Sequence, residues 1–330
     1  MSETALPLSH RAGGLGLTLR RNGALAALVL LLVFNAAVTP NFLSLQTLNV
    51  NLTQVAPIVI VAVGMTLVIA TGGIDLSVGS LMAIAGALAP LVFTGQLFPI
   101  PSEALAIGLG ILLPVVAVAA LGWLNGVVIT RYRIQPIVAT LVLYIAGRGI
   151  AQVVTNGNLQ VFAVPGFQFL GLGRVLGIPV QAILMVVVVA LAAFALHRSL
   201  IGRQILAVGG NERAARLSGV PVARVKRTVY LVSGVCAGIA GLITVAINSS
   251  SDANLVGSGM ELDAIAAVAV GGTLLSGGRA TVLGTLIGAL IIQLVRTTLI
   301  ANGIPDAAAL VVKAGLIIVA VWVQRQGRSS

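Results

Sequence analysis

Long apolar runs, separated by short polar or basic connections, constrain this sequence more than any other feature. A helix needs about 20 apolar residues to cross the hydrocarbon core of a bilayer. Because 58% of the residues are hydrophobic and only 8% are charged, the runs exceed what the core of a soluble domain requires. The sequence therefore predicts an all-α polytopic membrane protein with about ten transmembrane helices. The candidate spans are residues 23–38, 54–71, 76–97, 104–129, 134–154, 180–196, 229–247, 263–275, 280–300 and 307–323.

Basic residues test this count independently of hydropathy. Of the 19 lysines and arginines, all but Arg148, Arg174, Arg296 and Lys313 fall in connections on one side of the membrane. Lys and Arg mark cytoplasmic connections, so both termini are predicted in the cytoplasm. Arg148, Arg296 and Lys313 lie inside predicted spans, near their outer third, where we expect structural contacts with the interface or the acidic outer loops. The net charge of +11 reflects this bias, and no basic stripe interleaved with aromatics indicates nucleic-acid binding.

A polar, basic island occupies residues 207–226, within a cytoplasmic loop of about 198–228. Asn211 can cap a helix N-terminus, Gly219 can take the left-handed C-terminal position, and Pro221 forbids continuation. The resulting helix has roughly two turns, which is too short to be stable alone in water. The island is therefore either a docking element for a soluble protein or an ordinary basic loop that obeys the positive-inside rule.

An eight-residue pattern occurs twice. Residues 72–79 read GGIDLSVG and residues 271–278 read GGTLLSGG, so both fit GG-x-x-L-S-x-G. Short, glycine-broken apolar segments in corresponding positions are typical of a transport pathway, because discontinuous helices present free backbone groups to a cavity. The alternative is a pair of tight cytoplasmic turns in which Asp75 or Ser77 caps the next span. The pattern leaves both interpretations open.

Other chemistry-bearing residues give little sign of catalysis. The sequence contains no HExxH motif and no P-loop. Cys236 lies among small residues and is predicted to pack, and we expect no catalytic residue, metal site or cofactor. The outer segment 155–179 is rich in glycine and carries three phenylalanines. It could lie on the membrane surface or receive a partner.

Two stretches carry a family resemblance. Residues 209–226, GGNERAARLSGVPVARVK, and residues 72–80, GGIDLSVGS, resemble hallmark segments of the ribose-type permeases of ABC sugar importers. The resemblance continues in GFQFLGLGRVLGIPV, ELDAIAAVAVGGTLLSGG and GTLIGALIIQ, and so covers nearly the whole chain. Within that family, SSDAN and ALIIQ are similar to the permeases for furanose sugars such as galactofuranose.

The resemblance implies a bacterial inner-membrane subunit with a single permease domain, 23–324, between cytoplasmic tails 1–22 and 325–330. It implies that the basic island couples to an ATPase and that the outer segment 155–179 meets a partner. The expected coupling residues are Gly209, Asn211, Glu212, Ala215, Leu217 and Gly219. The expected translocation-path residues, at the two repeated elements, are Gly72, Gly73, Asp75, Ser77, Gly271, Gly272 and Ser276.

The partners implied are an ATP-binding subunit, with two ATPase domains often fused in one polypeptide, a second permease subunit and an extracytoplasmic sugar-binding protein. The expected function is the translocation of a monosaccharide. Two alternatives remain: a branched-chain amino acid permease, whose family is distantly similar, and a stand-alone secondary carrier. A carrier usually places titratable groups deep in the membrane, and only Asp75 comes close to this requirement.

Overall fold

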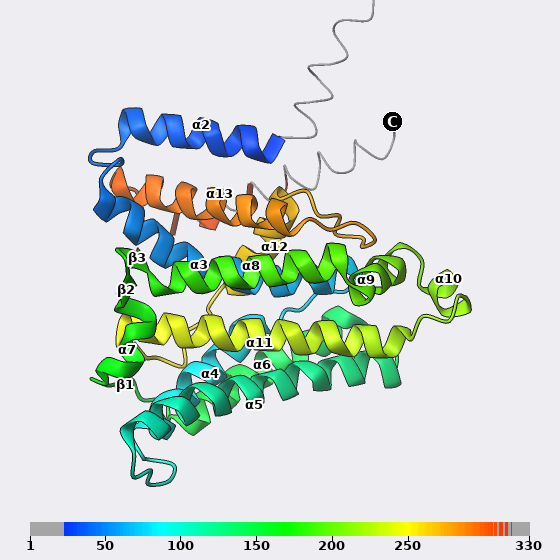
Figure 1. Ribbon diagram of the computed structural model, residues 1–330, viewed down its shortest axis with the longest axis horizontal. Helices are drawn as coiled ribbons and strands as arrows, with labels where there is room; N and C mark the ends of the chain where they lie inside the picture. The colour runs from blue at the N-terminus through cyan, green and yellow to red at the C-terminus, as the bar shows by residue number, and fades with distance from the viewer. Residues whose placement is uncertain (1–22, 306, 309, 313, 316–317, 319–330) are drawn as a thin grey trace, which may run out of the picture.

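The computed structural model describes residues 23–305, 307–308, 310–312, 314–315 and 318. Most of these residues are helical, which confirms the predicted all-α class, and the helices lie side by side in one bundle (Figure 1). The helices are α2 (Gly23–Val38), α3 (Leu45–Ala70), α4 (Val78–Phe93), α5 (Glu103–Arg131), α6 (Pro136–Val154), α7 (Pro165–Leu172), α8 (Val180–Arg198), α9 (Leu200–Gly210), α10 (Glu212–Leu217), α11 (Val222–Asn248), α12 (Met260–Val270) and α13 (Val282–Ala301).

Two small antiparallel strand pairs accompany the helices. Strand β1 (Gln160–Val161) pairs with β4 (Ser250–Ser251), and β2 (Arg174–Val175) pairs with β3 (Ile178–Pro179). Both pairs lie with α7 at one end of the bundle, whereas α9 and α10 lie at the opposite end (Figure 1). The predicted outer segment and the predicted basic island therefore occupy opposite ends of the molecule.

Within the described residues, six helices are long and apolar enough to cross a membrane: α3, α5, α6, α8, α11 and α13. Helices α2 and α4 are apolar but have 16 residues each, and α12 has 11. About half of the predicted span at 307–323 lies outside the described residues, and both predicted tails lie wholly outside them. The count of about ten spans therefore stays a prediction.

Two helices begin earlier than the sequence predicted. Residues 45–51, expected to belong to an outer connection, form the first turns of α3. The Ser44 Oγ caps this helix by accepting a hydrogen bond from the Thr47 N–H at 3.1 Å, and the Asn51 side chain donates to the Thr47 carbonyl. Helix α11 begins at Val222 instead of residue 229, directly after Pro221. Polar side chains that hydrogen-bond to backbone groups of their own helix extend it beyond the apolar run.

The core lies along α3 and α11. In the most apolar window of α3, 83% of the residues are buried, against 22% in α5. Small residues bring α5 and α11 together: a Cβ added at Gly234 would lie 2.5 Å from the Val118 carbonyl oxygen. The outer helices expose Leu, Val and Ile side chains, as helices in contact with lipid do.

The end that carries α7 is fixed to the bundle by aromatic packing. The Phe167 ring is fully buried and its centroid lies 4.7 Å from that of Phe93 and 5.6 Å from that of Phe162. Arg148 of α6 donates to the carbonyls of Ala253 and Val256 at 2.7 and 2.6 Å. The predicted structural contact of Arg148 is thus confirmed, and Lys313 lies outside the described residues. Buried Cys236 packs against Gly64, as predicted.

Candidate functional site

The first repeated element, 72–79, connects α3 to α4 and centres on Asp75, which is fully buried. Its Oδ1 accepts hydrogen bonds from the Ser77 N–H and Oγ at 3.0 and 2.5 Å. Its Oδ2 accepts one from Ser233 Oγ of α11 at 2.8 Å. The Asn125 side chain of α5 donates to Ser77 Oγ at 3.1 Å. Asp75 therefore closes the turn before α4 and, with Ser77, joins this element to α5 and α11.

The second repeated element, 271–278, connects α12 to α13 in the same way. The Thr281 N–H donates to Thr273 Oγ1 at 3.1 Å, and Thr281 Oγ1 donates to the Gly271 carbonyl at 3.2 Å. A Cβ added at Gly271 would overlap the Gly284 carbonyl oxygen, so this glycine lets α12 and α13 cross closely. Both elements are turns between helices, and Gly72, Gly272 and Ser276 are exposed on them.

The backbone conformations of the two elements are offset by one residue relative to the alignment of their sequences. The letters place Gly72 opposite Gly271. In the structure, the left-handed residues are Gly72 (φ 81°) and Gly272 (φ 83°), because α12 continues one residue further before its C-terminal turn. Only glycine adopts such a conformation readily.

The two elements and the end of α9 meet at one place, which we call the glycine junction: Ala70, Gly72, Gly209, Gly277 and Gly278. The Gly278 N–H donates to the Ala70 carbonyl at 3.1 Å. A Cβ added at Gly209 would overlap that carbonyl oxygen and lie 2.5 Å from the Gly278 nitrogen. A Cβ added at Gly277 would lie 2.8 Å from the Gly72 nitrogen. Backbone thus packs directly on backbone where the three segments meet.

Helix α10 follows α9 directly and ends as the sequence predicted. The Asn211 side chain accepts a hydrogen bond from the Ala214 N–H at 3.0 Å, which confirms the N-cap. Gly219 has a φ of 81°, and the Val220 N–H reaches back to the Ala215 carbonyl at 3.0 Å. This is the hydrogen-bonding pattern of a helix that ends on a left-handed glycine.

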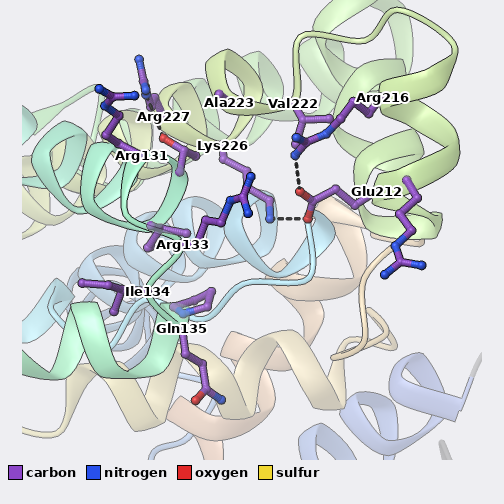
Figure 2. A pocket seen from close by; sticks show the side chains of 14 residues that line it. Arg131, Arg133, Ile134, Gln135, Glu212, Arg216, Val222, Ala223, Lys226 and Arg227 are labelled. Atoms are coloured by element: carbon purple, nitrogen blue, oxygen red, sulfur yellow. Dashed lines mark hydrogen bonds and ion pairs between the residues drawn. The ribbon is translucent and has the colours of Figure 1, made fainter.

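Helix α10 has only one buried residue. Ala215 is 5% exposed and faces its own chain, whereas Leu217 is 89% exposed. Glu212 is paired with Lys226 of α11 at 2.7 Å and with Arg216 at 3.0 Å (Figure 2). The hydrogen bond from Lys226 lowers the pKa of the Glu212 carboxyl, and Arg216 adds to this effect. Helix α10 therefore has six residues, one inward-facing alanine and a fully exposed leucine, and its Glu212 is held by two basic side chains.

The structure divides the predicted coupling residues into two groups. Asn211, Leu217 and Gly219 are exposed in or beside α10, and Glu212 there is partly exposed, whereas Gly209 belongs to the glycine junction and Ala215 packs inward. Among the predicted path residues, Gly73 is enclosed, because a Cβ there would lie 2.5 Å from Tyr230 Oη. Asp75 and Ser77 are sealed inside the bundle in this conformation.

Sequence reasoning missed the partners that hold these residues. Ser233 lies 158 residues from Asp75, and Asn125 lies 48 residues from Ser77. The only sequence signal was that each is a polar residue within an apolar run. Among the described residues, no group of three or more His, Cys, Asp or Glu side chains could hold a metal ion.

Comparisons with known proteins identify the family of the chain. Residues 47–321 match the family described as "Branched-chain amino acid transport system / permease component". The chain belongs to this family and is a multi-pass membrane protein.

Several curated proteins are similar to this chain over most of its length. The ribose import permease protein RbsC of Escherichia coli K12 is 40% identical over 312 residues, covering 92% of this chain and 93% of the relative. The galactofuranose transporter permease protein YtfT of the same strain is 40% identical and covers 92% and 89%. The fructose import permease protein FruF of Bifidobacterium longum is 37% identical and covers 81% and 74%. No solved structure matches the chain.

Proposed function

We propose that this chain is the permease subunit of an ATP-driven ABC importer for a monosaccharide in the bacterial inner membrane. The observation that carries the proposal is 40% identity to ribose and galactofuranose permeases over nearly the full length of both chains. Since the two relatives are equally similar, identity does not separate ribose from galactofuranose as the substrate. The exposed face of α10 supports the need for a cytoplasmic partner.

The proposed assembly follows from what the chain lacks in sequence. It contains no P-loop, so ATP hydrolysis would belong to a separate subunit. The family resemblance implies that this subunit carries two ATPase domains, often fused in one polypeptide. A second permease subunit would complete the membrane part, and an extracytoplasmic binding protein would deliver the sugar to the end that carries α7. Both termini would be cytoplasmic, with about ten crossings in a single permease domain, 23–324.

The proposed path runs beside the two repeated elements, along the exposed faces of Gly72, Gly272 and Ser276. A neutral sugar is bound by hydroxyl, amide and backbone groups, which these turns offer. Asp75 and Ser77 would line the path only after the turn has moved, and in the described conformation they keep α4 in place. The path residues thus belong to a part of the bundle that the transport cycle must shift.

The glycine junction supplies a mechanical route from α10 to that path. A displacement of α10 by the ATPase would act on α9, whose Gly209 packs on Ala70 and Gly278 at the ends of both elements. Because packed backbone deforms little, a shift of α9 would act on both turns. This is the step that would join ATP hydrolysis to translocation.

Purification through a tag on this chain, followed by reconstitution in liposomes, tests the function. We expect an ATP-binding subunit to co-purify, and ATP-dependent uptake of labelled ribose, galactofuranose or fructose when the binding protein is added. Uptake of leucine without uptake of any sugar would support the branched-chain amino acid alternative. Sugar uptake by the chain alone, without ATP, would show a secondary carrier and contradict the proposal.

A further inference from the structure

A strongly basic pocket lies beside α10, between the ends of three long helices. It has a volume of about 910 Å³ and is lined by the last turn of α5, the start of α6, α10 and the first turns of α11 (Figure 2). Six cationic side chains and one carboxylate line it. These charged residues are Arg131, Arg133, Arg213, Arg216, Lys226, Arg227 and Glu212.

The carboxylate does not balance this charge. Glu212 is already paired with Arg216 and Lys226, and the Arg227 Nε donates to Thr130 Oγ1 at 2.9 Å. The side chains of Arg131, Arg133 and Arg213 form no hydrogen bond or ion pair with any described residue. Like charges gathered in one hollow repel each other, so an anion that entered the pocket would relieve this repulsion.

The pocket lies where the headgroups of the inner leaflet are expected. Helix α5 has 29 residues, and its length of about 43 Å exceeds the hydrocarbon thickness of about 30 Å. Its last residue, Arg131, therefore reaches the polar layer of the membrane, together with the first residues of α6 and α11. Basic pockets between transmembrane helices at this depth suit the phosphates of acidic lipids.

We propose that this pocket binds a phosphate-bearing anion that carries more than one negative charge. Guanidinium groups pair with phosphate oxygens through two parallel hydrogen bonds, and several unpaired arginines favour two phosphates over one. This chemistry has two sources: the headgroup of a lipid with two phosphates, such as cardiolipin, and a free diphosphate anion of the cytoplasm. The site is distinct from the exposed face of α10 at Leu217, and it does not rest on the proposed substrate.

The test uses the purified full chain and two probes. In one arm, cardiolipin or phosphatidylcholine is added to the protein in neutral-lipid nanodiscs, and bound lipid is counted by native mass spectrometry. In the other arm, pyrophosphate is titrated in detergent, with the thermal unfolding midpoint as readout. We expect saturable binding of one anion per chain in at least one arm, which identifies the source, and no response to phosphatidylcholine.

Matched variants locate the site. The double variant Arg131→Gln/Arg133→Gln should weaken binding roughly 30-fold, about fivefold for each arginine. Arg198→Gln/Arg203→Gln removes the same charge from exposed cytoplasmic positions outside the pocket and should bind like the unmodified chain. Gln135→Glu adds a negative charge to the lining and should also weaken binding. This variant tests the same site if the first variant does not fold. Absence of binding in both arms, or equal loss in both double variants, would overturn the proposal.

Discussion

The two repeated elements share a sequence pattern but are held in place differently. The first is tied to the bundle through a buried carboxylate, since Asp75 and Ser77 reach α11 and α5 through Ser233 and Asn125. The second has leucine at the corresponding position, whether the letters or the backbone are aligned (Leu274 or Leu275). It is closed by nearby threonines and by tight crossing of α12 and α13.

The difference suggests that the two elements have different roles in transport. A buried carboxylate with three hydrogen bonds has one low-energy arrangement, because any shift leaves polar groups unpaired. The hydrogen bonds between threonine and backbone in the second element join residues of the same turn and need not break when the turn shifts as a unit with α12 and α13. We therefore expect the first element to act as an anchor and the second to move more during transport.

Making the first element resemble the second should have the largest effect on stability. Asp75→Leu leaves Ser77, Ser233 and the Ser77 N–H without their buried acceptor, so we expect a loss of about 4 kcal/mol in unfolding free energy. The measurement is thermal unfolding of the purified protein in detergent. Leu274→Met, the matched change in the second element, should cost less than about 1.5 kcal/mol. Equal costs for the two variants would remove the distinction between anchor and mobile element.

Disturbing the packing of α9 against the two elements should have the next largest effect on stability. Gly209→Ala places a methyl group against the Ala70 carbonyl oxygen and should cost about 2 kcal/mol by overpacking. It should also reduce ATP-dependent uptake in liposomes, because the junction would no longer close. Gly210→Ala is the control, since a Cβ there meets nothing within 4 Å. If both variants transport alike, the junction does not transmit movement.

Of these three substitutions, the one that removes a single hydrogen bond from the Asp75 carboxylate should have the smallest effect on stability. Ser233→Ala takes one of three hydrogen bonds from the Asp75 carboxylate and should cost about 1 kcal/mol. In the double variant Ser233→Ala/Asp75→Leu, the second change should add less than it does alone, because the two side chains act together. Strictly additive costs in the thermal unfolding midpoints would show that Ser233 does not hold the first element.

Local features were predictable from the sequence, and long-range ones were not. Asn211 and Gly219 fixed the ends of α10 because capping depends on a few adjacent residues. The apolar runs located most helices, although polar residues such as Asn51 extended α3 beyond its run. Asp75 was recognised as unusual, but its link to Ser233 depends on how α3 and α11 pack. The one-residue offset between the repeated elements could not be read from their letters, since it depends on where α12 ends.

The roles of Ala215 and Gly209 illustrate the same limit. Both lie in the segment that resembles a coupling region, and the sequence alone could not tell an inward residue from an outward one on so short a helix. The structure places Ala215 against its own chain and leaves Leu217 to the surface. A bulky residue at 215 would therefore disturb the seating of α10, whereas a change at exposed Leu217 tests docking directly.

The most direct test of the account is ATP hydrolysis by the complete complex, with and without sugar-loaded binding protein, in Leu217→Asp and unmodified chains. Leu217 is 89% exposed, so the variant should fold with an unchanged thermal unfolding midpoint. If α10 is the contact through which the ATPase drives both repeated elements, the variant should lose the ATPase subunit or keep it without stimulation by sugar. A variant that assembles and is stimulated like the unmodified chain would show that α10 is an ordinary basic loop and would contradict the account.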